Sequence, residues 1–243
     1  MAHRHIAGLS MEDRLSVLGE QIRRNARDNT LIFLDTGAII DFEQQGRVWR
    51  ARDRESLSSF YYALMGSGFP VFVNRRVYAE TKRHATENFL NGRHEISPET
   101  MAFVHLMYKN FHKFLRQFVD RNDQPIDEVR YDVYWASQLA LGQDPRSNGL
   151  DRISRTDKSL VAAAVWSRYA HLPGAVGMRD IDGGEGGKKQ DTVPIDGTII
   201  ISPDGHVREI VDLLTDRSAV SYDLQSDCGI KFGYDGIRVV SSR

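Results

Sequence analysis

The segment LIFLDTGAII, residues 31–40, indicates the fold class of this chain. Four large apolar residues run without interruption up to Asp35, a pattern typical of a strand buried on both faces of a parallel sheet. An acid at the end of such a run would be costly to bury without a partner. Asp35 is therefore the first candidate functional residue.

Further strands and helices follow along the chain. Largely apolar runs predict strands at 69–74, 197–201 and 237–240. Thr156 is expected to cap a helix that starts at Asp157, and Ser202 with Pro203 to start another. Apolar residues spaced three and four apart predict the remaining helices: residues 11–28, 54–65 and 75–90, the run from Phe103 to Phe118, and the run from Val129 to Ala140. This alternation favours an α/β protein, a three-layer α/β/α sandwich with a central parallel sheet and extra inserted helices.

The length of 243 residues fits one large domain with additions. We expect an N-terminal helical extension, residues 1–29, and a domain over residues 30–243. Within that domain, a helical insertion is expected at about 92–150 and a flexible loop at about 172–194. The glycine-rich part of this loop lacks the Gly-Lys-Ser/Thr pattern of a phosphate-binding loop.

The composition is that of an ordinary soluble protein, with 41% hydrophobic and 27% charged residues. The net charge of -1 gives no overall basic field for nucleic acid, so such binding would need a local patch. Cys228 is the only cysteine, which excludes an internal disulfide and a cysteine-rich zinc site. The sequence shows neither a signal-peptide core nor a membrane-spanning apolar run, so we expect a cytoplasmic protein with no membrane partner.

Four acids are expected to meet at one edge of the sheet. Asp35 ends the first strand, and Asp204 follows the strand at 197–201. Glu80 and Asp157 lie near the starts of helices that begin at the same edge, where open parallel sheets bind their ligands. Gathered carboxylates repel one another, and a hard divalent cation such as Mg²⁺ or Mn²⁺ removes that cost. Such a site favours attack of metal-activated water on a phosphodiester.

The segments around these acids resemble, in chain order, the four acidic motifs of the PIN-domain nucleases. The matching segments are FLDTGAII (33–40), VYAETKRH (77–84), RTDKSLVAAA (155–164) and IISPDGHV (200–207). The chain departs from the family by its greater length relative to the small PIN toxins. It also departs at Ser202 and Pro203, where the family often has Thr and a polar residue.

The resemblance implies a PIN-like fold and a Mg²⁺- or Mn²⁺-dependent endoribonuclease. The substrate would be single-stranded RNA, and the products would carry a 5′-phosphate and a 3′-hydroxyl. Thr36 and Ser202 would be supporting hydroxyl groups. The metal ligands and catalytic residues would be Asp35, Glu80, Asp157 and Asp204. The alternative is a PIN-like module that binds RNA or a protein partner without cleaving.

The same residues are compatible with other functions or with purely structural roles. Leu34 to Ala38 also resembles the active-site loop of aspartic proteases, but those proteins are all-β and need two such loops. A haloacid dehalogenase phosphatase would need a second Asp where Gly37 stands. Asp157 and Asp204 could have a purely structural role, because a negative charge in the first turn stabilises a helix. Glu80 could be a solvated or ion-paired side chain.

A local basic patch is the candidate nucleic-acid surface. Residues 75–116 contain eight Lys or Arg and four acids, and aromatic residues are interleaved with the basic residues. The alternative is that the aromatic residues belong to the hydrophobic core and the basic residues form the solvated face. The N-terminal and aromatic helices could also contact an antitoxin, another protein partner or a second copy of the chain. The possible RNA contacts are Arg75, Arg76, Lys82, Arg83, Lys109 and Lys113.

Overall fold

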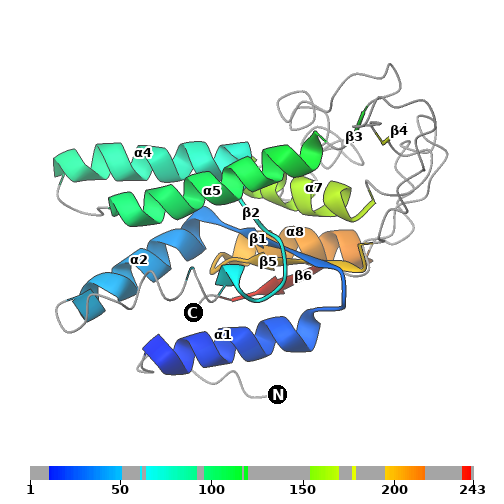
Figure 1. Cartoon of the computed structure of the whole chain (residues 1–243), viewed down its shortest axis with the longest axis horizontal. Coiled ribbons are helices and arrows are strands. Elements are labelled where there is room, and N and C mark those ends of the chain that lie inside the picture. The colour runs from blue at the N-terminus through cyan, green and yellow to red at the C-terminus, as the bar shows by residue number, and fades with distance from the viewer. Residues whose placement is uncertain are drawn as a thin grey trace.

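The computed structural model describes most of the regions that carry the predicted motifs. It covers residues 11–50, 61, 64–91, 96–116, 118–119, 154–169, 177–178, 195–216 and 237–241. The described chain is a mixed α/β protein with an open four-stranded parallel sheet in the order β2-β1-β5-β6 (Figure 1). The predicted α/β class and parallel sheet are therefore confirmed.

The sheet is built around two buried central strands, β1 (Thr30–Leu34) and β5 (Gly197–Ile201). Every residue of both strands is buried, which explains their largely apolar sequences. On one side, β2 (Val71–Phe72) pairs with β1, and on the other, β6 (Ile237–Val240) pairs with β5. Because all pairings are parallel, the carboxyl ends of these strands lie at one edge of the sheet.

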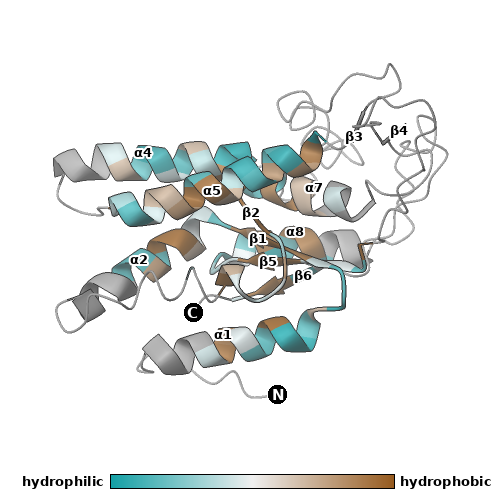
Figure 2. Ribbon diagram, in the orientation of Figure 1, coloured by the Kyte–Doolittle hydropathy of each residue, from teal (hydrophilic) through white to brown (hydrophobic). Residues whose placement is uncertain are grey.

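Helices pack against this sheet, and Figure 2 shows apolar residues gathered on the strands and on parts of the neighbouring helices. Contacts join α7 to β1 and β5, α5 to β2, and both α1 and α8 to β6. None of the helices in the described ranges is long and apolar enough to cross a membrane. The helix bounds are α1 Met11–Asn25, α2 Thr36–Arg50, α4 Arg75–Asn91, α5 Pro98–Leu115, α7 Arg155–Tyr169 and α8 Gly205–Asp216.

The aromatic residues of α5 belong largely to the core. Phe111 is fully buried, and its ring lies 5.4 Å from that of Phe33 on β1 and 5.4 Å from that of Phe72 on β2. The helix ends at Leu115, so the prediction that Phe118 continues it was wrong. Phe118 instead lies in β3 (Phe118–Val119), which pairs antiparallel with β4 (Gly177–Met178).

Several predicted features fall partly or wholly outside the described residues. The helix expected from Val129 to Ala140 lies outside them, as does most of the insertion at about 92–150. Only residues 177–178 of the loop expected at 172–194 are described, and they form β4. Of the helix expected at 54–65, the described residues Tyr61, Leu64 and Met65 are helical.

Candidate metal centre

Asp35 lies at the junction of β1 and α2, at the carboxyl edge of the sheet. Its backbone N–H donates to the carbonyl of Ile201 at 3.0 Å, and its carbonyl accepts from the N–H of Ile39 at 3.1 Å. The backbone is therefore fixed both by the sheet and by the first turn of α2. The side chain is buried, with 4% exposure, and its Oδ2 accepts a hydrogen bond from Ser202 Oγ at 2.7 Å.

Burial raises the pKa of Asp35 from an ordinary value of 3.8 to about 7. The hydrogen bonds from the Ser202 hydroxyl and the Thr36 backbone lower the pKa, while the carboxylates of Asp157 and Glu80 raise it. The charged form of Asp35 is thus disfavoured both by desolvation and by two neighbouring acids. A cation close to this carboxylate would reverse that preference.

Glu80 reaches the same edge from α4. Thr36, at the start of α2, donates from its Oγ1 to Glu80 Oε2 at 3.3 Å. The half-buried carboxylate of Glu80 influences the pKa of both Asp35 and Asp157. Thr36 therefore connects the helix that follows Asp35 to the acid on α4, which is a supporting position.

Asp157 lies in the first turn of α7 and is buried, with 7% exposure. Its pKa is raised chiefly by burial, a change that a hydrogen bond from Ser154 opposes. The carboxylates of Asp204 and Glu80 raise the pKa further, and His206 lowers it. Asp157 is thus the member of the group that interacts with all the other ionisable residues of the centre.

The predicted cap of α7 was wrong by two residues. Ser154, not Thr156, accepts a hydrogen bond on its Oγ from the backbone N–H of Asp157, at 3.0 Å. The helix starts at Arg155, so Thr156 already lies inside it. Because Ser154 satisfies this backbone N–H, Asp157 is not needed as a cap, although the helix N-terminus still favours its charge.

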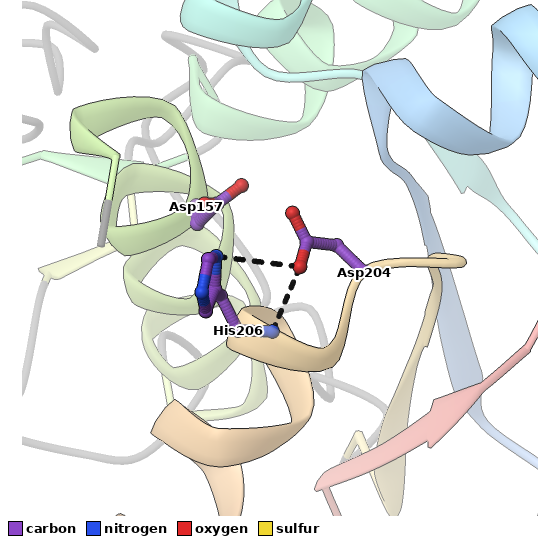
Figure 3. A group of neighbouring side chains, drawn as sticks. All are labelled: Asp157, Asp204 and His206. Carbon is purple, nitrogen blue, oxygen red and sulfur yellow. Dashed lines mark hydrogen bonds and ion pairs between the residues drawn. The ribbon is translucent and has the colours of Figure 1, made fainter. Parts of the chain in front are cut away.

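The turn between β5 and α8 also differs from the prediction. Ser202 was expected to cap the helix, but its Oγ donates to Asp35 and accepts from the Asp204 N–H at 3.0 Å. Asp204 is the residue that caps α8, since its Oδ1 accepts from the His206 N–H at 2.8 Å. The capping interpretation of Asp204 is therefore confirmed, yet the same carboxylate also faces Asp157 (Figure 3).

His206 is a member of the centre that the sequence analysis missed. One potential ligand atom from each of Asp157, Asp204 and His206 lies within 4.8 Å of the others, and Nδ1 of His206 is 3.4 Å from Asp204 Oδ1 (Figure 3). The available signal was a histidine two residues after Asp204, in the first turn of a helix that begins at the ligand-binding edge. Carboxylate oxygens and an imidazole nitrogen at this spacing could hold a divalent metal ion.

Gly37 allows the two halves of the centre to approach closely. A Cβ atom at this position would lie 2.8 Å from Cγ of Pro203 and 3.3 Å from Oδ2 of Asp35. The proline ring cannot swing away as a long side chain can, so the turn that carries Ser202 and Asp204 would have to move. A glycine in the Asp-Thr-Gly segment is therefore explained by packing against this turn.

The Gly37→Ala variant is expected to lose about 1–3 kcal/mol of unfolding free energy, the usual cost of overpacking. It should also bind Mn²⁺ more weakly, because Ser202 and Asp204 move with Pro203. Denaturant unfolding and calorimetric Mn²⁺ titration measure the two effects. Gly205→Ala is the matched control, since a Cβ there meets no atom of the described part of the chain within 4 Å. Equal stability and Mn²⁺ affinity in the two variants would contradict this packing role.

The predicted RNA-contact residues lie on the adjoining helices α4 and α5. Arg76 is half-buried, while the other five are exposed. Arg76 and Arg83 are four residues before and three residues after Glu80, and so share its face of α4. These two arginines are therefore on the same side of α4 as one of the four acids. Lys109 and Lys113 belong to α5, which packs beside α4 (Figure 1).

No protein-family model matches this chain, and neither a curated protein nor a solved structure does so. The chemistry of the centre is therefore the basis for assigning a function.

Proposed function

We propose that this chain is a Mg²⁺- or Mn²⁺-dependent endoribonuclease that hydrolyses single-stranded RNA to products with a 5′-phosphate and a 3′-hydroxyl. One observation supports the proposal above all others. Four acids from four separate segments interact electrostatically in a connected series at the carboxyl edge of a parallel sheet. The interacting pairs are Asp35 with Glu80, Asp35 with Asp157, Glu80 with Asp157, and Asp157 with Asp204.

A bound divalent cation would account for this arrangement of acids. Burying Asp35 next to other carboxylates costs free energy unless a positive charge compensates, and hydrogen bonds from Ser202 and Thr36 only partly do so. A metal ion held by one or two carboxylates together with substrate phosphate is the usual form of a Mg²⁺ site.

Each residue has a proposed role in the reaction. Asp35, Glu80, Asp157 and Asp204 would be the metal ligands, joined by His206, whose ligand atom lies within 4.8 Å of those of Asp157 and Asp204. Ser202 and Thr36 would orient Asp35 and Glu80 through the hydrogen bonds described above. When bound, the ion would lower the pKa of an attacking water and stabilise the leaving oxygen. The guanidinium groups of Arg76 and Arg83 would contact the RNA phosphates beside the scissile bond.

The same proposal includes a PIN-like three-layer fold and a cytoplasmic location. The sheet order supports the former, because β1 and β5, whose ends carry Asp35 and Asp204, are adjacent and central. The single cysteine, Cys228, suits a reducing compartment. An antitoxin or other protein partner and self-association belong to the proposal as well.

A cleavage assay on end-labelled single-stranded RNA tests the activity. With Mn²⁺ or Mg²⁺ we expect internal cleavage and 5′-phosphate ends, and with EDTA no cleavage. Double-stranded RNA and single-stranded DNA of the same sequence serve as comparison substrates. Tight Mn²⁺ or RNA binding without cleavage of any substrate would reject the nuclease in favour of a non-cleaving binding module.

The His206→Ala variant is expected to change metal preference. Its Kd for Mn²⁺ should rise by about tenfold, a loss typical of removing a group that supports a metal site. The Kd for Mg²⁺ should change much less, since Mg²⁺ prefers oxygen ligands. Calorimetric titration with each metal measures the ratio of the two Kd values. The control is His105→Ala, which replaces an exposed histidine on a different helix, α5. An unchanged Mn²⁺/Mg²⁺ ratio would exclude His206 as a ligand.

A further inference from the structure

Asn74 and Ser159 form a buried polar link outside the acidic group. Asn74 follows β2 and is 1% exposed, and Ser159 lies on α7 and is 4% exposed. The Asn74 side-chain amide donates from Nδ2 to Ser159 Oγ at 2.9 Å. These residues are 85 positions apart in the sequence, so the hydrogen bond joins two distant segments.

Asn74 is also tied to the helix that carries Glu80. Its Oδ1 accepts from the backbone N–H of Val77 at 2.9 Å, and its carbonyl accepts from the N–H of Tyr78 at 2.9 Å. The residue thus caps α4 with one side-chain atom and reaches α7 with the other. A serine or aspartate cap would satisfy the helix equally well but would lack this second, amide donor.

The link connects the helices of two proposed metal ligands. Glu80 comes six residues after Asn74 on α4, and Asp157 comes two residues before Ser159 on α7. The carboxylate of Glu80 is close enough to repel that of Asp157 and helps to raise the pKa of Asp157. In the absence of a cation this repulsion acts to separate the N-terminal ends of α4 and α7, where Glu80 and Asp157 lie. The buried hydrogen bond from Asn74 to Ser159 joins these two helix ends and opposes that separation.

We propose that Asn74 and Ser159 are positioning residues that hold Glu80 and Asp157 at the spacing required by a divalent metal ion. This inference rests on the proposed function, because it assumes that the two acids share an ion. The link makes the site preformed, so that metal binding does not have to draw the two helices together. Loss of this hydrogen bond should lower the free energy of metal binding by more than it lowers the free energy of unfolding.

Metal titration of single variants tests the role. In Ser159→Ala, and in Asn74→Ser, which keeps a capping hydroxyl, we expect the Kd for Mn²⁺ to rise by about tenfold, as for other groups that orient metal ligands. Ser159→Thr retains the hydroxyl and should bind within about threefold of the wild type. The control is Ser167→Ala on the same helix, a buried hydroxyl with no hydrogen-bond partner among the described residues. It should leave the Kd unchanged.

A double-variant cycle separates positioning from general damage. If the two residues act through one hydrogen bond, Asn74→Ser combined with Ser159→Ala should weaken Mn²⁺ binding no more than either change alone. Melting temperatures in EDTA report the structural cost of each variant. Wild-type-like Mn²⁺ affinity in Ser159→Ala would overturn the positioning role while leaving the nuclease proposal intact. Absence of Mn²⁺ binding by the wild type would overturn the proposed function and this inference with it.

Discussion

Replacing Asp35 with Asn is expected to reduce Mn²⁺-dependent RNA cleavage by about a thousandfold or more, the scale of losing a key charge-stabilising group. Asn has nearly the same shape and can still accept the hydrogen bond from Ser202, so the chain should fold. What is lost is the negative charge at the centre of the acidic group. Initial rates measured over a range of Mn²⁺ concentrations show whether added metal restores activity.

The control for this variant lies at the other end of the same strand. Asp28 is an exposed acid just before β1, and Asp28→Asn should cleave RNA at the wild-type rate. Sequencing the RNA ends from all three proteins separates specific cleavage from contaminating nuclease. Undiminished, Mn²⁺-dependent cleavage by the Asp35→Asn protein would show that this carboxylate is not part of the catalytic centre.

In metal-free buffer, the wild-type protein is expected to lose stability relative to Asp35→Asn as the pH rises from about 4 to about 7. The pKa of Asp35 is about 7 in the folded chain and 3.8 as its ordinary value, so the folded state binds more protons throughout this range. Stability falls with pH wherever the folded state holds more protons than the unfolded state. The difference amounts to about 4 kcal/mol once Asp35 is fully charged.

Metal should reverse this effect. Mn²⁺ favours the charged carboxylates, so it should raise the melting temperature of the wild type more at about pH 8 than at about pH 5. The Asp35→Asn protein should respond much less at either pH. Thermal unfolding with EDTA and with Mn²⁺ at each pH provides the comparison. A stability difference between the two proteins that is independent of pH would contradict the raised pKa of Asp35.

The strands and the general position of the acids could be predicted because they depend on local sequence. Residues 197–201 form a strand with the predicted bounds, since a strand buried on both faces must be largely apolar. The strand at 237–240 also has the predicted bounds, although its Arg238 is exposed. Asp35 could be assigned to the end of β1 for the same reason. Helix ends were predicted less well: Ser154 rather than Thr156 caps α7, because several hydroxyl residues near a helix start compete for the same N–H groups.

The sequence by itself determined an α/β chain whose acids follow strands or begin helices, because apolar periodicity and helix-start signals act over a few residues. Only the tertiary structure decided that Ser202 bonds to Asp35, that His206 joins Asp157 and Asp204, and that Asn74 reaches Ser159. These contacts join residues far apart in the chain, and their distances depend on how helices pack on the sheet. The raised pKa of Asp35 likewise arises from burial and from neighbours on other segments.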